Sequence, residues 1–271
     1  MVEPDEGSAV VEDARVTSEI RSNRHEISPA DVISAFLLGG GFLIVVLLGL
    51  VQAVDVGARE IALLALLGLA HVMAGRVVFE STAGMAVATQ PILVVAWLVL
   101  PPLMVPVVVA FGLLTQSRPR WSFASTHQLL VSAASGWHSL GAVIVLSIVD
   151  AEPSLSNWYW YALALAAQFV MDATVAAIRC LALGLRLGVL VQPLRWMYAI
   201  DVLLAPVGLT AVLAAGATGW AVLLAMSPVG VLALVSRDRV ESFERAVTIG
   251  SAFEDAMNVA RIDPLTGLGN R

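Results

Sequence analysis

The sequence contains no lysine, a single cysteine and few charged residues of either sign. The lone cysteine, Cys180, excludes an internal disulfide, so the chain is not a disulfide-stabilised scaffold. Only 13% of the 271 residues are charged, whereas soluble globular chains carry about 25%. Hydrophobic residues make up 59% before the 21 glycines are counted, which is more apolar surface than one soluble globule of this size can bury. The composition excludes an ordinary soluble enzyme and a disordered protein, and predicts a membrane protein.

The charges that are present divide the chain into three regions. Residues 1–31 carry eight acidic residues and three arginines without apolar periodicity, which predicts a disordered acidic tail. Residues 32–235 carry seven acidic residues and seven arginines, so this long apolar region is neutral overall. Residues 236–271 are polar and mixed in charge. No basic cluster is long enough to indicate nucleic-acid binding, and the start lacks the pattern of a secretory signal.

The neutral region predicts an all-α polytopic transmembrane bundle. A helix that crosses the membrane needs about 20 apolar residues, each adding about 1.5 Å. The candidate helices are 33–53, 60–75, 84–100, 102–115, 128–149, 157–180, 197–215 and 218–235. The first has a clear start signal, because Ser28-Pro29-Ala30-Asp31 combines an N-cap residue, a proline at the first helical position and an acidic residue.

Prolines interrupt the third and fourth candidate helices. They are Pro91, Pro101, Pro102 and Pro106. As one helix, residues 84–115 would be about 48 Å long, whereas a bilayer core is about 30 Å thick. Two adjacent prolines also cannot lie inside a regular helix. The segment is therefore a short helical hairpin, which gives eight spans, or one broken helix, which gives seven. As an interrupted helix it is also a candidate binding element.

The arginines favour the eight-span alternative. With the C-terminus in the cytoplasm, eight spans place ten loop arginines inside and only Arg59 outside, whereas seven spans place seven inside and four outside. The positive-inside rule therefore predicts a multi-pass membrane protein with both termini cytoplasmic. A re-entrant hairpin that does not cross fully would give the same sidedness. The aromatic run at residues 158–161 is expected at the outer interface.

Polar residues inside the candidate helices are costly in hydrocarbon, so they are the first candidates for a functional site. They are His71, His138, Gln168, Asp172, Arg179 and Asp201. Gln168, Asp172 and Arg179 fall on one face of the helix 157–180. Arg179 is predicted to pair with Asp201 across neighbouring helices, either as a packing contact or as part of a ligand or proton site. Glu60 and His127 lie at predicted helix ends.

A metal or haem sensor through the two intramembrane histidines is an alternative that their spacing disfavours. By helical rise, His71 and His138 differ in depth by about 9 Å, and neither has a second ligand one turn away on its own helix. Ser135, one turn before His138, instead predicts a hydrogen-bonded structural histidine. Small residues on two helices predict close contacts within the bundle. These residues are Gly39, Gly40 and Gly41, and Ser132 with Gly136.

Residues 236–261 predict a signalling coiled-coil helix. Their apolar positions are Val240, Phe243, Val247, Gly250, Phe253, Met257 and Ala260. The steps between them alternate between three and four residues, except for one repeated step of three at Gly250, which is a stammer in a heptad seam. Such a seam predicts a homodimer. An amphipathic helix lying on the bilayer is the alternative, but the narrow apolar stripe and the mixed charges disfavour it.

The last nine residues carry a specific motif. They read Asp263-Pro264-Leu265-Thr266-Gly267-Leu268-Gly269-Asn270-Arg271. This segment resembles the opening motif of GGDEF domains, D-x-L-T-G-L-x-N-R, at all seven specified positions. GGDEF domains are diguanylate cyclases, which join two GTP molecules into cyclic di-GMP. The overall layout also looks like the multi-span sensor domains that precede such cyclases.

The resemblance implies a sensor and transmission module of a bacterial inner membrane, which regulates a cyclase domain starting at residue 262 and cut at its first turn. The signal would be an unidentified small molecule or a property of the membrane. In the family the catalytic residues lie beyond this motif, so the chain is expected to hold no catalytic site and no cofactor, and GTP and Mg²⁺ would bind only the cyclase domain. A transporter, a ligand-uptake protein and a passive membrane anchor are the alternatives.

Overall fold

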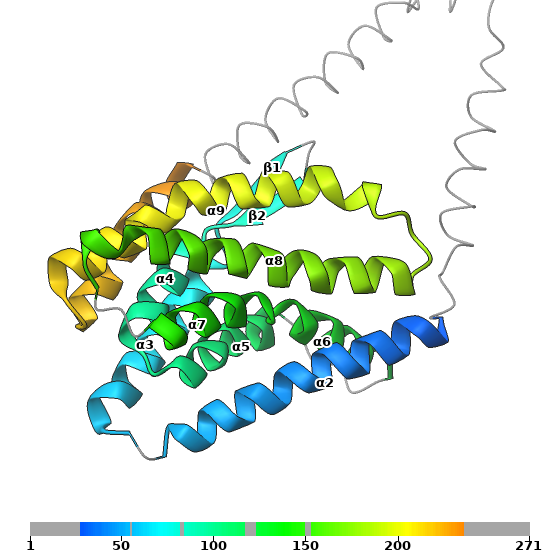
Figure 1. Cartoon of the computed structure of the whole chain (residues 1–271), viewed down its shortest axis with the longest axis horizontal. Coiled ribbons are helices and arrows are strands. Elements are labelled where there is room, and N and C mark those ends of the chain that lie inside the picture. The colour runs from blue at the N-terminus through cyan, green and yellow to red at the C-terminus, as the bar shows by residue number, and fades with distance from the viewer. Residues whose placement is uncertain (1–27, 55, 82–83, 117–122, 150–152, 236–271) are drawn as a thin grey trace, which may run out of the picture.

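The computed structural model describes residues 28–54, 56–81, 84–116, 123–149 and 153–235 (Figure 1). The helices are α2 (Pro29–Gln52), α3 (Ala58–Ala74), α4 (Gln90–Val99), α5 (Val105–Gln116), α6 (Phe123–Ser135), α7 (His138–Val149), α8 (Trp158–Ala182), α9 (Gly188–Ala215) and a last helix, Gly219–Val235. Two 3-10 turns, η1 (Pro102–Met104) and η2 (Leu155–Asn157), precede α5 and α8. Residues 1–27 of the predicted acidic tail, the signalling helix and the motif at residues 263–271 lie outside the described residues. The last residues assigned to that tail, 28–31, instead form the N-cap and first turn of α2.

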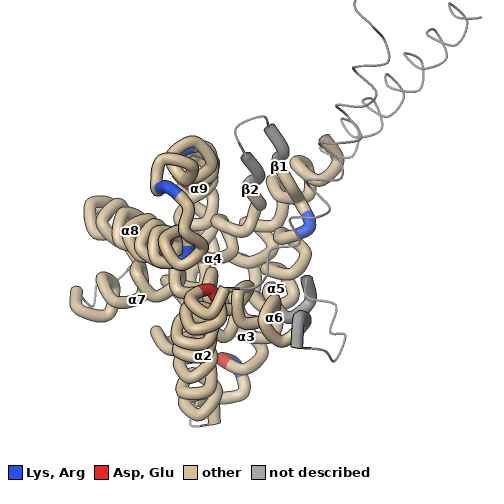
Figure 2. Tube along the Cα trace, turned by 90° about the vertical axis from the view of Figure 1, so that its right-hand side faces the viewer, with Lys and Arg blue, Asp and Glu red and all other residues tan. Residues whose placement is uncertain are grey.

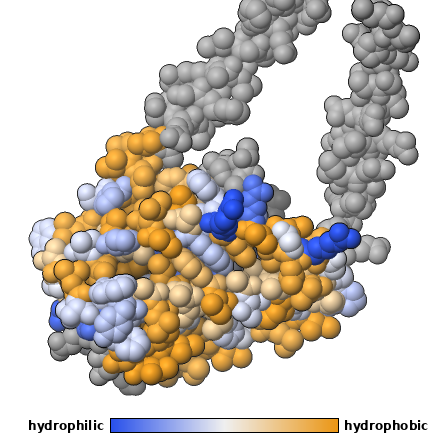
Figure 3. Space-filling view, turned by 45° about the horizontal axis from the view of Figure 1, so that its top comes forward, coloured by the Kyte–Doolittle hydropathy of each residue, from blue (hydrophilic) through white to orange (hydrophobic). Residues whose placement is uncertain are grey.

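The predicted apolar helical bundle is present. Four helical stretches are long and apolar enough to cross a membrane: Pro29–Gln52, Thr126–Val149, Leu155–Ala182 and Gly188–Ala215. Three further apolar helices are shorter: Gln90–Val99, Pro102–Leu113 and Gly219–Val235. Many large apolar side chains on the outside are exposed, including Leu37 at 71% and Leu203 at 72%. A surface this apolar suits lipid, and Figure 3 shows it over much of the visible face.

The first long helix begins where the sequence predicts. The Ser28 side chain accepts a hydrogen bond from the Asp31 backbone N–H at 3.1 Å, and Pro29 occupies the first turn. This is the N-cap arrangement that satisfies one of the free N–H groups at a helix start. α2 then packs against α6, α5 and η1 along its length.

A β-hairpin replaces the start of the third predicted helix. β1 (Val78–Ser81) and β2 (Gly84–Val87) are antiparallel, with Val78 opposite Val87, and β2 packs against α9. The expectation of a helix over 84–100 is therefore wrong for its first residues. Hydropathy marks this segment as apolar but does not distinguish a short strand from a helix turn, and the helix itself starts only at Gln90, beside Pro91.

The proline-broken segment forms two short helices in the middle of the bundle. α4 has ten residues, or about 15 Å, so it does not cross a bilayer core of about 30 Å by itself. Residues 90–97 are all buried, mainly against α9, α3 and α5. Pro101 and Pro102 separate α4 from η1 and α5. α5 has twelve residues, so neither short helix reaches the length of a full span, and the eight full-length spans are not confirmed.

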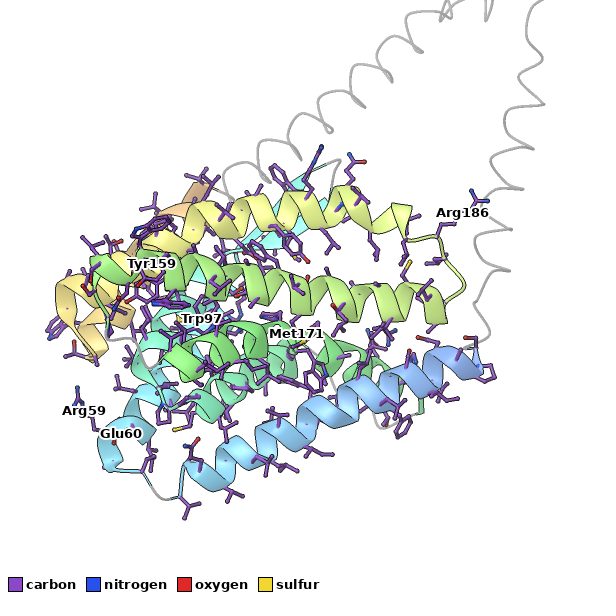
Figure 4. The ribbon with its side chains drawn as sticks, viewed as in Figure 1. Arg59, Glu60, Trp97, Tyr159, Met171 and Arg186 are labelled. Atoms are coloured by element: carbon purple, nitrogen blue, oxygen red, sulfur yellow. The ribbon has the colours of Figure 1, made fainter. Side chains whose placement is uncertain are left out.

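Two long-range hydrogen bonds define the ends of the bundle. At one end, Ser28 Oγ donates to the Ala182 carbonyl oxygen at 3.4 Å, which joins the start of α2 to the end of α8. At the opposite end, Arg59 donates to the carbonyl oxygen of Ala217. We refer to these as the Ser28 end and the Arg59 end. Figure 4 shows Arg59 and Glu60 at one extreme of the molecule and Arg186 at the other.

Candidate functional site

Charged positions are sparse in the described helices, as Figure 2 shows in a view onto the Ser28 end. The buried polar side chains join different pairs of helices. Three of these interhelical contacts are a carboxylate with two basic partners, a pair of amides, and a tyrosine with a carboxylate.

The strongest polar contact centres on Asp31, in the first turn of α2. Arg179 Nη2 donates to Asp31 Oδ1 at 2.8 Å, and His127 Nε2 lies 3.0 Å from Asp31 Oδ2. Only 7% of the Asp31 side chain is exposed, against 15% for Arg179 and 13% for His127. The cluster therefore ties α2 to α8 and α6 at the Ser28 end.

The predicted pair between Arg179 and Asp201 is wrong. Arg179 lies in the last turn of α8, where a positive charge is favourable, and Asp31 lies in the first turn of α2, where a negative charge is favourable. The Ser28–Ala182 contact brings these two helix ends together. Arg179 therefore meets a carboxylate from α2 rather than the one on α9.

Two glutamines form a buried amide pair. Gln90 Nε2 donates to Gln168 Oε1 at 3.3 Å, and Gln168 Nε2 donates to Gln90 Oε1 at 2.9 Å. The two side chains belong to α4 and α8, and both are at least 97% buried. Gln168 is among the sequence candidates, but Gln90 is not. The sequence feature that could have indicated Gln90 is its position just before Pro91, where it is the one amide side chain in a long apolar run.

Replacing one member of the glutamine pair should cost more than replacing both. Gln90→Leu leaves the Gln168 amide buried without a partner, and we expect the free energy of unfolding to fall by about 1–3 kcal/mol. The Gln90→Leu/Gln168→Leu double variant removes both polar groups and should lie close to the parent protein. The measurement is unfolding of the purified protein in mixed micelles. Equal losses in the single and double variants would contradict a mutual hydrogen-bond pair.

Asp172 has a tyrosine partner on α9. Tyr198 Oη donates to Asp172 Oδ2 at 2.9 Å and lies 3.1 Å from the Phe169 carbonyl oxygen. The Tyr198 ring stacks on Phe169, with ring centres 4.3 Å apart. Asp201 lies one turn after Tyr198 and is partly buried, and its side chain has no hydrogen-bond or ion-pair partner within the described residues. Gln168, Asp172 and Arg179 thus share a stripe on α8 but contact three different partners.

The two intramembrane histidines have separate environments. His138 Nδ1 lies 2.6 Å from the Ser135 carbonyl oxygen, so the predicted structural hydrogen bond one turn away is present. His71 is buried against Gly112 of α5, where even a Cβ atom would lie 2.5 Å from the imidazole ring. In the described part of the chain, no three His, Cys, Asp or Glu side chains are placed to hold a metal ion.

The small residues of α2 lie at a close helix contact. A Cβ atom on Gly39 would lie 2.2 Å from the Leu130 carbonyl oxygen of α6, and one on Gly41 would lie 3.1 Å from the Trp137 ring. Gly136 packs against the Phe42 ring in the same way. Gly40, between the two contact glycines, has no atom within 4 Å of its Cβ position. The predicted close approach within the bundle is confirmed for Gly39, Gly41 and Gly136.

Three of the four prolines occupy helix starts. Pro91 and Pro106 lie in the first two positions of α4 and α5, and Pro102 begins η1. A proline is favourable there because the first N–H groups of a helix have no acceptor within the helix, so the helix loses no hydrogen bond when proline lacks one. Pro101 and Pro102 alone produce the break between α4 and η1 inside the bundle.

No family model, no curated protein and no solved structure matches the chain.

Proposed function

We propose that the chain is the membrane sensor and transmission module of a diguanylate cyclase. The observation that carries this proposal is the segment 263–271, which has the D-x-L-T-G-L-x-N-R pattern at every specified position. It follows a polar heptad segment, which in turn follows the last apolar helix, Gly219–Val235. A membrane receptor with a cytoplasmic enzyme is expected to have this order: an apolar bundle, a coiled-coil helix and the first motif of the enzyme domain.

In this proposal the Ser28 end faces the cytoplasm. It holds the start of α2 and the α8–α9 loop with Arg186, while the Arg59 end holds the exposed aromatic residues Trp158 and Tyr159 (Figure 4). Arginines on the cytoplasmic side and aromatic residues at the outer interface fit this orientation. The chain then crosses the membrane an even number of times, with the α4–α5 hairpin entering from one side or counting as two short spans.

Signal transmission would run through the last helix into residues 236–261. A homodimer seam there would hold two cyclase domains face to face, since each cyclic di-GMP needs two GTP molecules. The stammer at Gly250 offers two neighbouring packings of the seam, which is what a switch requires. GTP and Mg²⁺ would bind the cyclase domain alone.

The test is the protein expressed from the complete reading frame. Membranes that contain it should convert GTP to cyclic di-GMP in the presence of Mg²⁺, as measured by mass spectrometry. Phe253→Asp places a charge in the predicted seam, and it should strongly lower both cross-linked dimer and product. Ser251→Asp, two residues away and off the seam, is the matched control and should change neither.

Two outcomes would overturn the proposal. One is a frame after Arg271 that encodes no further cyclase motif. The other is a protein with those motifs that forms no product, although it is folded and binds GTP. Equal activity of the two Asp variants would refute the dimer seam while leaving the cyclase assignment in place.

A further inference from the structure

The start of α9 extends beyond the helix that the sequence predicts. The hydropathy pattern places this helix at residues 197–215, whereas in the structure it begins at Gly188 and has 28 residues. At about 1.5 Å per residue, α9 is about 42 Å long, which is about 12 Å more than the hydrocarbon core of a bilayer. The excess corresponds to about eight residues, which are residues 188–195 if the rest of α9 spans the core.

This extension is apolar and exposed. Val189 and Val191 are 56% and 64% exposed, and Leu187 just before them is also exposed. Apolar side chains are unfavourable in water, so the extension is not suited to project straight out of the membrane. Pro193 lies inside the helix, where a proline removes one backbone hydrogen bond and allows a bend. A tilted position within the membrane interface accommodates both the length and the apolar surface.

The same part of the chain carries positive charge without a counter-charge. Residues 173–200 contain three arginines and no acidic residue. Arg179 is paired with Asp31. Arg186 and Arg195 are exposed, and neither forms an ion pair with another residue that the structure describes. Figure 4 shows the Arg186 side chain pointing away from the helices. Two unpaired guanidinium groups thus lie on either side of residues 188–194.

This combination of charge and apolar surface matches the chemistry of a phospholipid. A guanidinium group binds phosphate well, because its planar N–H groups match two phosphate oxygens. Arg186 and Arg195 are separated by about 10 Å of helix, so each is placed to contact a headgroup of its own. Anionic lipids attract arginines near the membrane surface, and their acyl chains suit the exposed valines. A free phosphate would use only the arginines.

We propose that the α8–α9 loop and the first two turns of α9 form a binding surface for anionic phospholipids. Arg186 and Arg195 donate hydrogen bonds to lipid phosphate oxygens, while Val189 and Val191 contact the acyl chains. This interaction goes beyond the proposed cyclase function and does not depend on it.

The acidic N-terminal segment is the competing occupant of the two arginines. Residues 1–27 carry seven acidic residues and three arginines, and they precede Ser28, which contacts the end of α8. However, the part of this segment next to Ser28, residues 19–27, contains two acidic residues and two arginines, so its charge is balanced. Five of the acidic residues lie farther away along the chain, at positions 3–13. The charge distribution therefore favours lipid as the occupant.

The test is native mass spectrometry of the full chain, titrated in detergent with phosphatidylglycerol or phosphatidylcholine. The two lipids are chosen with identical acyl chains, and both contain a phosphate, but only phosphatidylglycerol has a net negative charge. We expect the first phosphatidylglycerol to bind about 25-fold more tightly than the first phosphatidylcholine, because each arginine near a lipid surface contributes about fivefold.

Substitutions assign this preference to the two arginines. Arg186→Gln and Arg195→Gln should each weaken phosphatidylglycerol binding by about fivefold, and the double variant should bind both lipids equally. Arg59→Gln is the matched control at the opposite end of the bundle, and it should leave the ratio of the two affinities unchanged. Val189→Ser/Val191→Ser should weaken the binding of both lipids alike, because the acyl chains are uncharged.

Four results would overturn the proposal. They are equal affinities of the parent protein for the two lipids, an unchanged preference in the double arginine variant, displacement of the lipid by an equal concentration of glycerol phosphate, and a preference that appears only when the five acidic residues at positions 3–13 are replaced by amides. The third would indicate a site for free phosphate, and the fourth would assign the arginines to residues 1–27. Because no GTP is involved, each result is independent of the cyclase assignment.

Discussion

Asp31→Asn is expected to lower the free energy of unfolding by about 3–5 kcal/mol, the usual cost of removing one partner from a buried ion pair. The substitution keeps the shape of the side chain but leaves Arg179, which is 15% exposed, without a counter-charge. It also removes the charge beside His127. The measurement is equilibrium unfolding of the purified chain in mixed micelles titrated with sodium dodecyl sulfate, followed by far-UV circular dichroism.

Two further variants make this result specific. Asp31→Leu/Arg179→Leu removes both charges and should recover most of the loss, since an apolar replacement of a buried pair is often neutral. Asp201→Asn changes the carboxylate that sequence reasoning assigned to Arg179, and it should cause no comparable loss. A large effect of Asp201→Asn together with a small one of Asp31→Asn would reverse the assignment.

Gly39→Ala is expected to destabilise the bundle by about 3 kcal/mol, the upper end of the cost of overpacking. The new methyl group would lie 2.2 Å from the Leu130 carbonyl oxygen, and a backbone atom cannot rotate away. α2 and α6 must therefore separate along their contact. The same unfolding titration measures the loss.

The neighbouring glycine provides the matched control. The Cβ position of Gly40 has no atom within 4 Å, so Gly40→Ala adds only helix propensity and should be neutral or stabilising by up to about 1 kcal/mol. Both variants add one methyl group to adjacent positions of one helix. Similar effects of the two would show that helix propensity, and not the contact with Leu130, decides the outcome.

Local signals in the sequence predict local structure well. Ser28, Pro29 and Asp31 identify the start of α2, and the hydrogen bond from Asp31 N–H to Ser28 Oγ is present at 3.1 Å. Two adjacent prolines predict a break, and α4 ends just before it. These features depend on the dihedral angles and hydrogen bonds of a few consecutive residues. They can therefore be predicted without knowing which helices are neighbours.

Contacts between helices are harder to predict. Helical rise placed Arg179 near an end of its helix, but rise gives depth and not which helices are neighbours. His127 lies at a predicted helix end and Asp31 in a predicted helix start, so the sequence alone does not indicate that either residue makes a contact between helices. The two lie 3.0 Å apart in the structure, although 95 residues separate them in the sequence. For the same reason the sequence indicates only Gln168 of the Gln90–Gln168 pair.

The burial of α4 has a consequence for how the protein is made. α4 packs chiefly against α9, where a Cβ atom on Gly208 would lie 2.3 Å from the Pro91 carbonyl oxygen. The ribosome adds residues at about 5–20 per second, so α9 is completed on the order of 5–20 s after α4 emerges. Until then the face of α4 that α9 covers is open to lipid or the insertion machinery, and Gln90 gains its amide partner only when Gln168 of α8 has been made. The centre of this bundle is thus completed late in biosynthesis, by a helix translated about 100 residues after the one it covers.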